Sequence, residues 1–448
     1  MRNRIKSNLF AAVFGKSVLI LQQFLLLPVF LAKWGVEYYG AWLIICALPA
    51  TLSSANLGLG PASSTRAVLA LGRGDVALAN KGVLSASVIL FIIYIPLTIG
   101  FFFIPADLIL IQNTSCISHV SIILGFLMAS AGVNSLAGPF EGYWVARGMA
   151  ARQIWIQSGF QLLNYLAIAL TIFFGGSGIH VACIQFIITS IGTASFIYLS
   201  CKLVSWEAWE LFDIVSTRAL IKDGIGFQLS SVWQAIYFQG SIFLANSFLG
   251  TSGVAAWTVV RIISRLGCQL LNLSYNAFYP EFQSAISKND LDSCRKIFTF
   301  GLTVSLIVGF CFAFGLSVFG SALVTFWTDS IIEVPDYAWF ILSMGFIFNS
   351  TWWTSQIIPF ALNQPWFINS RALVASFASI LTMYFLLMIK PSLISICLGY
   401  IVFDMLMAFA VLLYSLKKLH IGFYAALKQG LKTIQSELQL IYHGNFKK

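Results

Sequence analysis

The feature that most constrains this chain is a series of long apolar runs, each near the length that a helix needs to cross a bilayer. A spanning helix needs about 20 mostly apolar residues, and runs of that length recur along almost the whole chain. The runs are continuous and do not alternate as the strands of a membrane barrel would. With 59% hydrophobic and only 9% charged residues, the chain has too few polar groups to cover a surface in water. The sequence therefore predicts an all-α polytopic membrane protein.

The runs predict about twelve transmembrane helices, six before and six after one polar stretch. Their approximate ranges are 8–31, 39–59, 83–104, 118–139, 153–175, 179–201, 224–248, 252–277, 297–327, 337–361, 371–389 and 392–416. With twelve spans, 21 of the 26 basic residues fall in loops or termini on one side of the membrane. A missed span would invert every later loop and destroy this bias, which marks the cytoplasmic side. We therefore expect a multi-pass protein with both termini in the cytoplasm.

Polar stretches divide the chain into four parts. We predict an N-terminal six-helix bundle at 1–203, a cytoplasmic amphipathic linker at 204–222, a C-terminal six-helix bundle at 223–416 and a basic tail at 417–448. The tail places apolar residues at helical spacing beside lysines. That pattern fits an interfacial helix held partly by anionic lipids, and equally a solvated basic tail.

A single offset of 215 residues relates the two halves. It aligns Gly35 with Gly250, Ala41-Trp42 with Ala256-Trp257, Ala70–Asp75 with Ala285–Asp290, Lys81 with Lys296, and Asn134-Ser135 with Asn349-Ser350. An even number of spans in each half gives both halves the same orientation in the membrane. Such parallel repeats are typical of transporters that bind substrate between the repeats. We therefore predict two pseudo-twofold-related bundles around a central cavity.

Charged residues within the predicted spans are candidates for function, because a charge at mid-membrane costs at least ~2.5–3.5 kcal/mol on insertion scales. Arg261 and Arg265 lie one helical turn apart on one face of the eighth span. We expect them to face a water-filled cavity, or else to pair with a carboxylate. Lys16, in the first span, either joins them or extends to the cytoplasmic surface. Asp404, in the last span, is either a structural partner for an arginine or an ion-coupling site.

Uncharged polar residues form the rest of the candidate substrate site. They are Gln22, Asn56, Asn134, Gln234, Tyr237 and Gln239. Amides beside aromatic rings are the usual means of binding sugars, although helix–helix hydrogen bonds explain the same residues. Glu141 and Glu281 are expected at the cytoplasmic ends of helices. The cysteines lack metal-ligand spacing, and we expect no metal, no cofactor and no nucleic-acid partner.

The intramembrane charge is mainly positive, which favours an anionic cargo. Guanidinium groups suit pyrophosphate because they bind it through two parallel hydrogen bonds. A lipid-linked pyrophosphoryl sugar combines this charge with a polar head that cannot cross hydrocarbon unaided and an apolar tail that can stay in the bilayer.

The opening hairpin, Gly35-x4-Gly40-Ala-Trp42 followed by Asn56-Leu-Gly-Leu-Gly60, resembles the polysaccharide-transporter family. The basic loop Gly72-Arg-Gly-Asp75 and the six-plus-six plan are similar as well. That family belongs to the multidrug/oligosaccharidyl-lipid/polysaccharide exporter superfamily, and its O-antigen unit translocases are the nearest match. The resemblance implies a bacterial inner (plasma) membrane flippase that moves undecaprenyl-pyrophosphate-linked oligosaccharide to the periplasmic leaflet by alternating access. It also implies membrane lipids, an O-antigen polymerase and a chain-length regulator as partners.

Two other functions remain open. A multidrug antiporter of the same superfamily would need an acidic cavity for cationic drugs, and the first two predicted spans contain no Asp or Glu. A membrane glycosyltransferase, such as an O-antigen polymerase or ligase, typically needs a large periplasmic loop. No predicted exterior loop of this chain has that size, so a transporter rather than an enzyme is expected.

Overall fold

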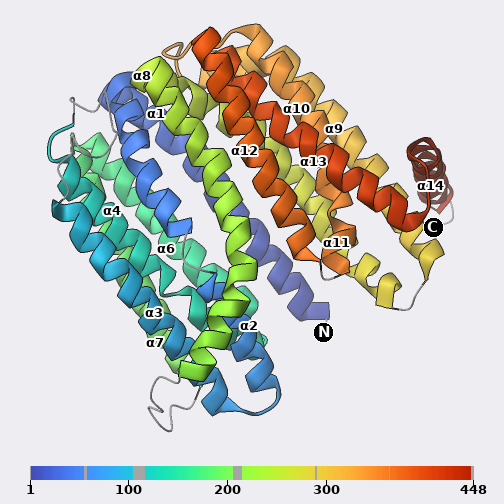
Figure 1. The fold of residues 1–448 in the computed structure, drawn as a ribbon, viewed down its shortest axis with the longest axis horizontal. Helices are drawn as coiled ribbons and strands as arrows, with labels where there is room; N and C mark the ends of the chain where they lie inside the picture. The colour runs from blue at the N-terminus through green and yellow to red at the C-terminus, as the bar shows by residue number, and fades with distance from the viewer. Residues whose placement is uncertain are drawn as a thin grey trace. The chain divides into compact units, whose positions relative to one another are not determined.

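The computed structural model describes residues 2–54, 58–103, 117–204, 214–287, 290–362 and 364–444 (Figure 1). In these ranges, nine helices are long and apolar enough to cross a membrane. The helices of the first half are α1 (Arg2–Ser54), α2 (Leu59–Gly72), α3 (Val76–Phe103), α4 (Val120–Ser135), the short 3-10 helix η2 (Gly138–Phe140), α5 (Glu141–Ala146), α6 (Ala150–Phe173) and α7 (Gly178–Cys201). Those that follow are α8 (Ile214–Ser287), α9 (Leu291–Trp327), α10 (Asp336–Ser355), α11 (Ile357–Ala361), α12 (Pro365–Ile389), α13 (Leu393–Leu419) and α14 (Phe423–Gly444).

One glycine divides each of the two longest helices. Gly35 in α1 has φ 74° and ψ 173°, and Gly250 in α8 has φ 69° and ψ −169°. Both lie in a region of backbone conformation that side chains with a Cβ rarely adopt, so glycine is the residue suited to the break. α1 and α8 thus provide two segments each. Together with α3, α4, α6, α7, α9, α12, α13 and the pair α10–α11, they make up the twelve segments that the sequence predicts. The two glycines are the first pair of the predicted repeat.

The same 215-residue offset relates the ends of helices throughout the two halves. The first residues of α3 and α9 are 215 positions apart, as are those of α6 and α12 and those of α7 and α13. The last residues of α5 and α11 have the same separation. Asp75 and Asp290 have the same role in the matched loops. The Oδ1 atom of Asp75 accepts the N–H of Leu78 at 2.9 Å, and that of Asp290 accepts the N–H of Ser293 at 3.0 Å. Each aspartate thereby caps the following helix, which explains the repeated loop motif.

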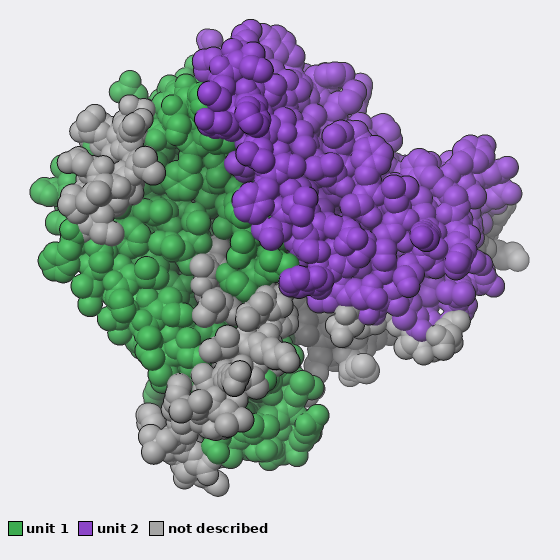
Figure 2. All heavy atoms as spheres, in the orientation of Figure 1, with its two compact units in different colours: residues 1–255, 327–331 green, residues 256–326, 332–448 purple. Residues whose placement is uncertain are grey.

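The chain forms two compact units (Figure 2). Unit 1 comprises residues 1–255 and 327–331, and unit 2 comprises residues 256–326 and 332–448. α8 begins at Ile214, within the predicted linker 204–222, and its first segment belongs to unit 1. Residues 205–213 of that linker lie outside the described residues. The division into four predicted parts remains a prediction.

In unit 1, α4 packs against α1, α3 and α7, and α6 packs against α1 and α7 (Figure 1). The short helix α5 is fixed to these helices by buried polar pairs. The Tyr143 hydroxyl donates to Asn80 Oδ1 at 2.9 Å, and the Trp144 Nε1–H donates to Ser200 Oγ at 2.7 Å. Buried polar groups without partners are costly, so these pairs fix α5 against α3 and α7.

In unit 2, the predicted basic tail contains the helix α14, and this helix packs against α9. Ala426 is fully buried in a cluster with Phe298 and Leu302 of α9. A Cβ on Gly430 would meet the Thr303 side chain, so only glycine allows this close approach. Leu427 packs against the same cluster, while Leu431 is 55% exposed. The contact face of α14 thus combines small residues with one apolar residue of the tail.

Candidate functional site

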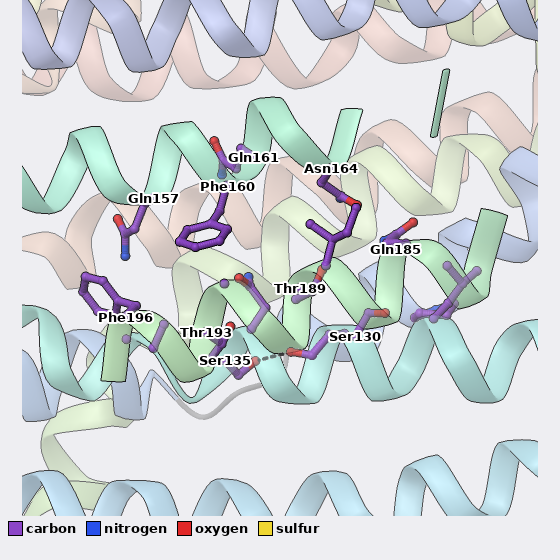
Figure 3. Close-up of a pocket in the computed structure, with 18 of the residues that line it drawn as sticks. Ser130, Ser135, Gln157, Phe160, Gln161, Asn164, Gln185, Thr189, Thr193 and Phe196 are labelled. Atoms are coloured by element: carbon purple, nitrogen blue, oxygen red, sulfur yellow. Dashed lines mark hydrogen bonds between the residues drawn. The ribbon is translucent and has the colours of Figure 1, made fainter. Parts of the chain in front are cut away.

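Unit 1 contains a polar cavity of about 770 Å³, bounded by α1, α4, α6 and α7 together with the start of α2, the turn after α4 and the first residue of α5. Small-molecule sites typically occupy about 300–1,000 Å³. Figure 3 shows Gln157 and Phe160 of α6 on one side of this space and Thr193 and Phe196 of α7 on another. Ser130 and Ser135 of α4 lie along a third side. The cavity therefore lies within one helical bundle.

Amides, hydroxyls and aromatic rings dominate the lining of this cavity. The amides are Gln22, Asn134, Gln157, Gln161, Asn164 and Gln185; the other polar or aromatic groups include Ser130, Ser135, Thr189, Thr193, Tyr165, Phe160 and Phe196. Primary amides both donate and accept hydrogen bonds. The described residues that line the cavity include no Lys, Arg or His. This lining suits an uncharged ligand with many hydroxyl groups.

Glu141 is the only acid among the lining residues that the structure describes. It is the first residue of α5, and its Oε1 accepts a hydrogen bond from Gln157 Nε2 at 3.0 Å. The side chain is partly buried. The sequence places Glu141 at a helix end, and the structure adds that it faces the cavity.

Asn164 lines the same cavity, and its Oδ1 atom is buried with no hydrogen-bond partner among the described residues. A buried acceptor without a partner costs about 1–3 kcal/mol. The protein encloses this oxygen, so Asn164 contributes its side chain to the lining and not an open acceptor.

The repeat shows how the cavity lining differs from the corresponding positions of unit 2. Asn134 lines the cavity, and its counterpart Asn349 is buried in unit 2. At three other lining positions the first half has the smaller or uncharged residue: Ala50 where the second half has Arg265, Ala137 where it has Trp352, and Thr189 where it has Asp404. Unit 2 thus has larger residues at the positions of Ala50 and Ala137, and smaller ones on the helix that corresponds to α6, where Ala372 and Ala375 align with Gln157 and Phe160.

In unit 2, Asp404 accepts two hydrogen bonds. Its Oδ1 atom accepts from Asn349 Nδ2 at 2.7 Å and from Trp352 Nε1 at 2.9 Å. Asp404 is only 8% exposed. Arg265 of α8 lies close enough for its charge to act on this carboxylate. The structure thus brings together two residues that the sequence selects separately as candidates, Arg265 and Asp404.

Replacing Asp404 with Ala is expected to lower the free energy of unfolding by about 2–5 kcal/mol. The change leaves the buried Asn349 and Trp352 donors without their acceptor, and each orphaned donor costs about 1–3 kcal/mol. The midpoint of thermal unfolding in detergent measures the loss. Asp404→Asn retains an acceptor oxygen and should lose less. Equal midpoints for the Ala variant and the parent protein would contradict this role for Asp404.

The structure places the predicted substrate residues in several environments. Gln22 and Asn134 both line the unit 1 cavity. Lys16 and Gln234 are exposed, Gln239 is half-buried and Tyr237 is buried; none of these four lines that cavity. Arg265 is exposed and Arg261 half-buried, so neither guanidinium is enclosed in dry packing. Asn56 lies outside the described residues. The assignment of all these residues to a substrate site remains a prediction.

The sequence prediction omitted most of the cavity lining, although its signal is present. On α6, Gln157, Gln161 and Asn164 recur at intervals of four and three residues, which places them on one helical face. On α7, Gln185 and Thr189 recur at an interval of four. Two apolar spans that each carry a row of polar residues on one face predict two helices that face each other across a polar space. Charged residues within spans predict a cavity by the same reasoning.

Solved transporter structures share this fold. No model of a known protein family and no curated protein matches the sequence. An inward-facing structure of a multidrug resistance MATE family transporter of the MOP superfamily matches with a TM-score of 0.72 and 14% identity. The match covers 93% of this chain and 99% of that one. An outward-facing structure of such a transporter matches with a TM-score of 0.64 and 14% identity, over 95% and 96% of the two chains.

A MOP superfamily transporter from Pyrococcus furiosus is also similar, with a TM-score of 0.64 and 15% identity over 93% of this chain and 95% of that one. It is described as having a binding pocket of reverse polarity that suggests a different function. This chain thus has the fold of the MOP superfamily transporters, a polytopic membrane protein of two six-helix bundles. The superfamily fold expected from the sequence is confirmed.

Proposed function

We propose that this protein is a flippase that moves an undecaprenyl-pyrophosphate-linked O-antigen oligosaccharide from the cytoplasmic to the periplasmic leaflet of the bacterial inner membrane. It would do so by alternating access, with both termini in the cytoplasm. Proteins of this fold are known in inward-facing and outward-facing conformations. The protein is then a transporter that makes and breaks no covalent bond in its cargo.

The observation that carries this proposal is the hydrogen-bonding surface of the unit 1 cavity, in which amides and hydroxyls dominate and Glu141 is the one charged group among the described lining residues. Six amides and several hydroxyls offer donors and acceptors at many angles, and Phe160 and Phe196 offer apolar ring faces. A sugar unit presents the same combination of hydroxyl groups and apolar C–H faces. A cavity built mainly for lipid tails would have no use for so many amides, because burying them without partners is costly.

Arg261 and Arg265 are proposed to bind the pyrophosphate. Both lie on the segment of α8 that belongs to unit 2, one turn apart, and neither is buried. Guanidinium groups bind phosphate oxygens through paired, charge-assisted hydrogen bonds. Asp404 is the proposed coupling residue, since its carboxylate lies near Arg265 and a bound ion at that carboxylate would alter the charge beside it.

The direct test is complementation of a bacterial strain that lacks its own translocase and makes repeat units of known composition. Expression of this protein is expected to restore O-antigen on the cell surface, measured on gels of extracted lipopolysaccharide. An O-antigen polymerase and a chain-length regulator are the proposed partners, and the strain must supply both. Failure with every repeat unit offered, at normal abundance in the membrane, would refute the proposal.

A multidrug antiporter is the second candidate, and Glu141 favours it because a carboxylate in the cavity can attract a cationic drug. The same strains discriminate between the two functions. An antiporter lowers the sensitivity of cells to cationic drugs and leaves O-antigen absent. A flippase restores O-antigen and leaves drug sensitivity unchanged.

A further inference from the structure

The unit 1 cavity has a charge asymmetry that restricts the sugars it can bind. Glu141 supplies the only formal charge among the described lining residues, and that charge is negative. Its Oε1 atom already accepts a hydrogen bond from Gln157, and Gln157 is an amide that leaves the charge in place. An incoming ligand therefore meets a carboxylate with no cation in the lining to offset it.

A carboxylate accepts hydrogen bonds and donates none when ionised. A neutral sugar can donate a hydrogen bond from a hydroxyl group to Glu141. The ammonium group of an amino sugar can donate a hydrogen bond and also neutralise the charge of the Glu141 carboxylate. The carboxylate of a uronic or other acidic sugar can only accept hydrogen bonds. Beside Glu141 it would therefore be repelled by a group of the same charge, with no donor to link the two. Like charges near each other repel more strongly in a partly buried site than in water.

The position equivalent to Glu141 in the second half carries no charge. The residue 215 positions later is Gln356, an uncharged amide of the same shape, at the junction of α10 and α11. Gln356 is 9% exposed, so the equivalent site in unit 2 accommodates the amide in a buried setting. The carboxylate at Glu141 is therefore a feature of unit 1 that the two halves do not share.

We infer that Glu141 is a specificity determinant that excludes acidic sugars and restricts the cargo to oligosaccharides whose cavity-bound residue is neutral or carries an amino group. This inference rests on the proposed function and narrows its substrate class. The excluded charge is that of the sugar, and the pyrophosphate is assigned to Arg261 and Arg265 in unit 2.

The test uses two translocase-deficient strains whose lipid-linked repeat units differ in one sugar, a neutral hexose or the corresponding hexuronic acid. The quantity measured is the ratio of acidic to neutral O-antigen displayed at equal membrane abundance of the protein. The parent protein is expected to give a ratio of one tenth or less, and Glu141→Gln is expected to raise it at least tenfold. Glu141→Asp is the charge-preserving control, whose ratio should stay near that of the parent.

A second variant keeps the inference open to refutation if Glu141→Gln is poorly inserted. Gln157→Glu adds a second carboxylate beside that of Glu141 and should lower the ratio of acidic to neutral O-antigen further. Equal display of both repeat units by the parent, or a ratio that neither substitution shifts, would overturn the inference and leave the flippase proposal standing. Display of neither unit would instead overturn the flippase proposal itself.

Discussion

Replacing Ala137 with Trp is expected to reduce O-antigen display by at least 100-fold while the protein stays in the membrane. Ala137 lines the cavity and is 8% exposed, and the repeat-equivalent residue in unit 2 is Trp352. An indole at this position would fill space that the sugar needs. The second half carries this Trp at the equivalent position, inside α10. Gels of extracted lipopolysaccharide, read beside immunoblots of membranes, measure the effect.

The matched control for this substitution is Leu163→Trp on α6. Leu163 is 52% exposed on an apolar helix and does not line the cavity, so a larger apolar ring there should leave display within about twofold. Asn164→Ala is a complementary variant that removes a polar group and adds no bulk. Normal display by Ala137→Trp at normal abundance would show that the cavity has no part in transport.

Replacing Arg261 or Arg265 with Ala is expected to lower display by roughly 10- to 100-fold, because each hydrogen bond to a charged group contributes about 1.5–3 kcal/mol. Lys variants should recover only part of the loss, since an ammonium group does not reproduce the paired bonds of a guanidinium. Initial rates of display after induction, at matched protein abundance, provide the measurement.

Arg265 needs one further variant because it lies near Asp404. If Arg265 serves only to offset that carboxylate, then Arg265→Ala combined with Asp404→Asn should restore display. If Arg265 binds the cargo, the double variant should stay as impaired as Arg265→Ala alone. Restoration by the double variant, or normal display by Arg261→Ala, would remove the corresponding arginine from the proposed phosphate site.

The repeat was predictable from the sequence because its markers are residues with strict local roles. Gly35 and Gly250 have positive φ, and Asp75 and Asp290 cap helices, so substitution at these positions carries a local cost. Such constraints keep recognisable residues at a fixed spacing. The twelve-segment plan follows with equal directness from the length and polarity of the apolar runs.

The cavity was predictable only in part. Gln22 and Asn134 were selected as isolated polar residues in apolar spans, and both line it. The space itself has little sequence signal: Ala137 is small where unit 2 has Trp352, whereas Gln157 and Phe160 are larger than their counterparts Ala372 and Ala375. Small residues are common in membrane helices as packing contacts. Only the comparison of the halves in three dimensions distinguishes a packing contact from an open space.

The most direct measurement of the central claim is site-specific crosslinking to the lipid-linked sugar. A photoreactive phenylalanine analogue is placed at Gln161 or Gln185, which line the cavity, or at Leu163, which does not. Membranes that make a radiolabelled lipid-linked repeat unit are then irradiated. Labelled protein from Gln161 and Gln185, with none from Leu163, is the predicted result. Label at Leu163 alone, or at none of the three positions in membranes that display O-antigen, would contradict sugar binding in the unit 1 cavity.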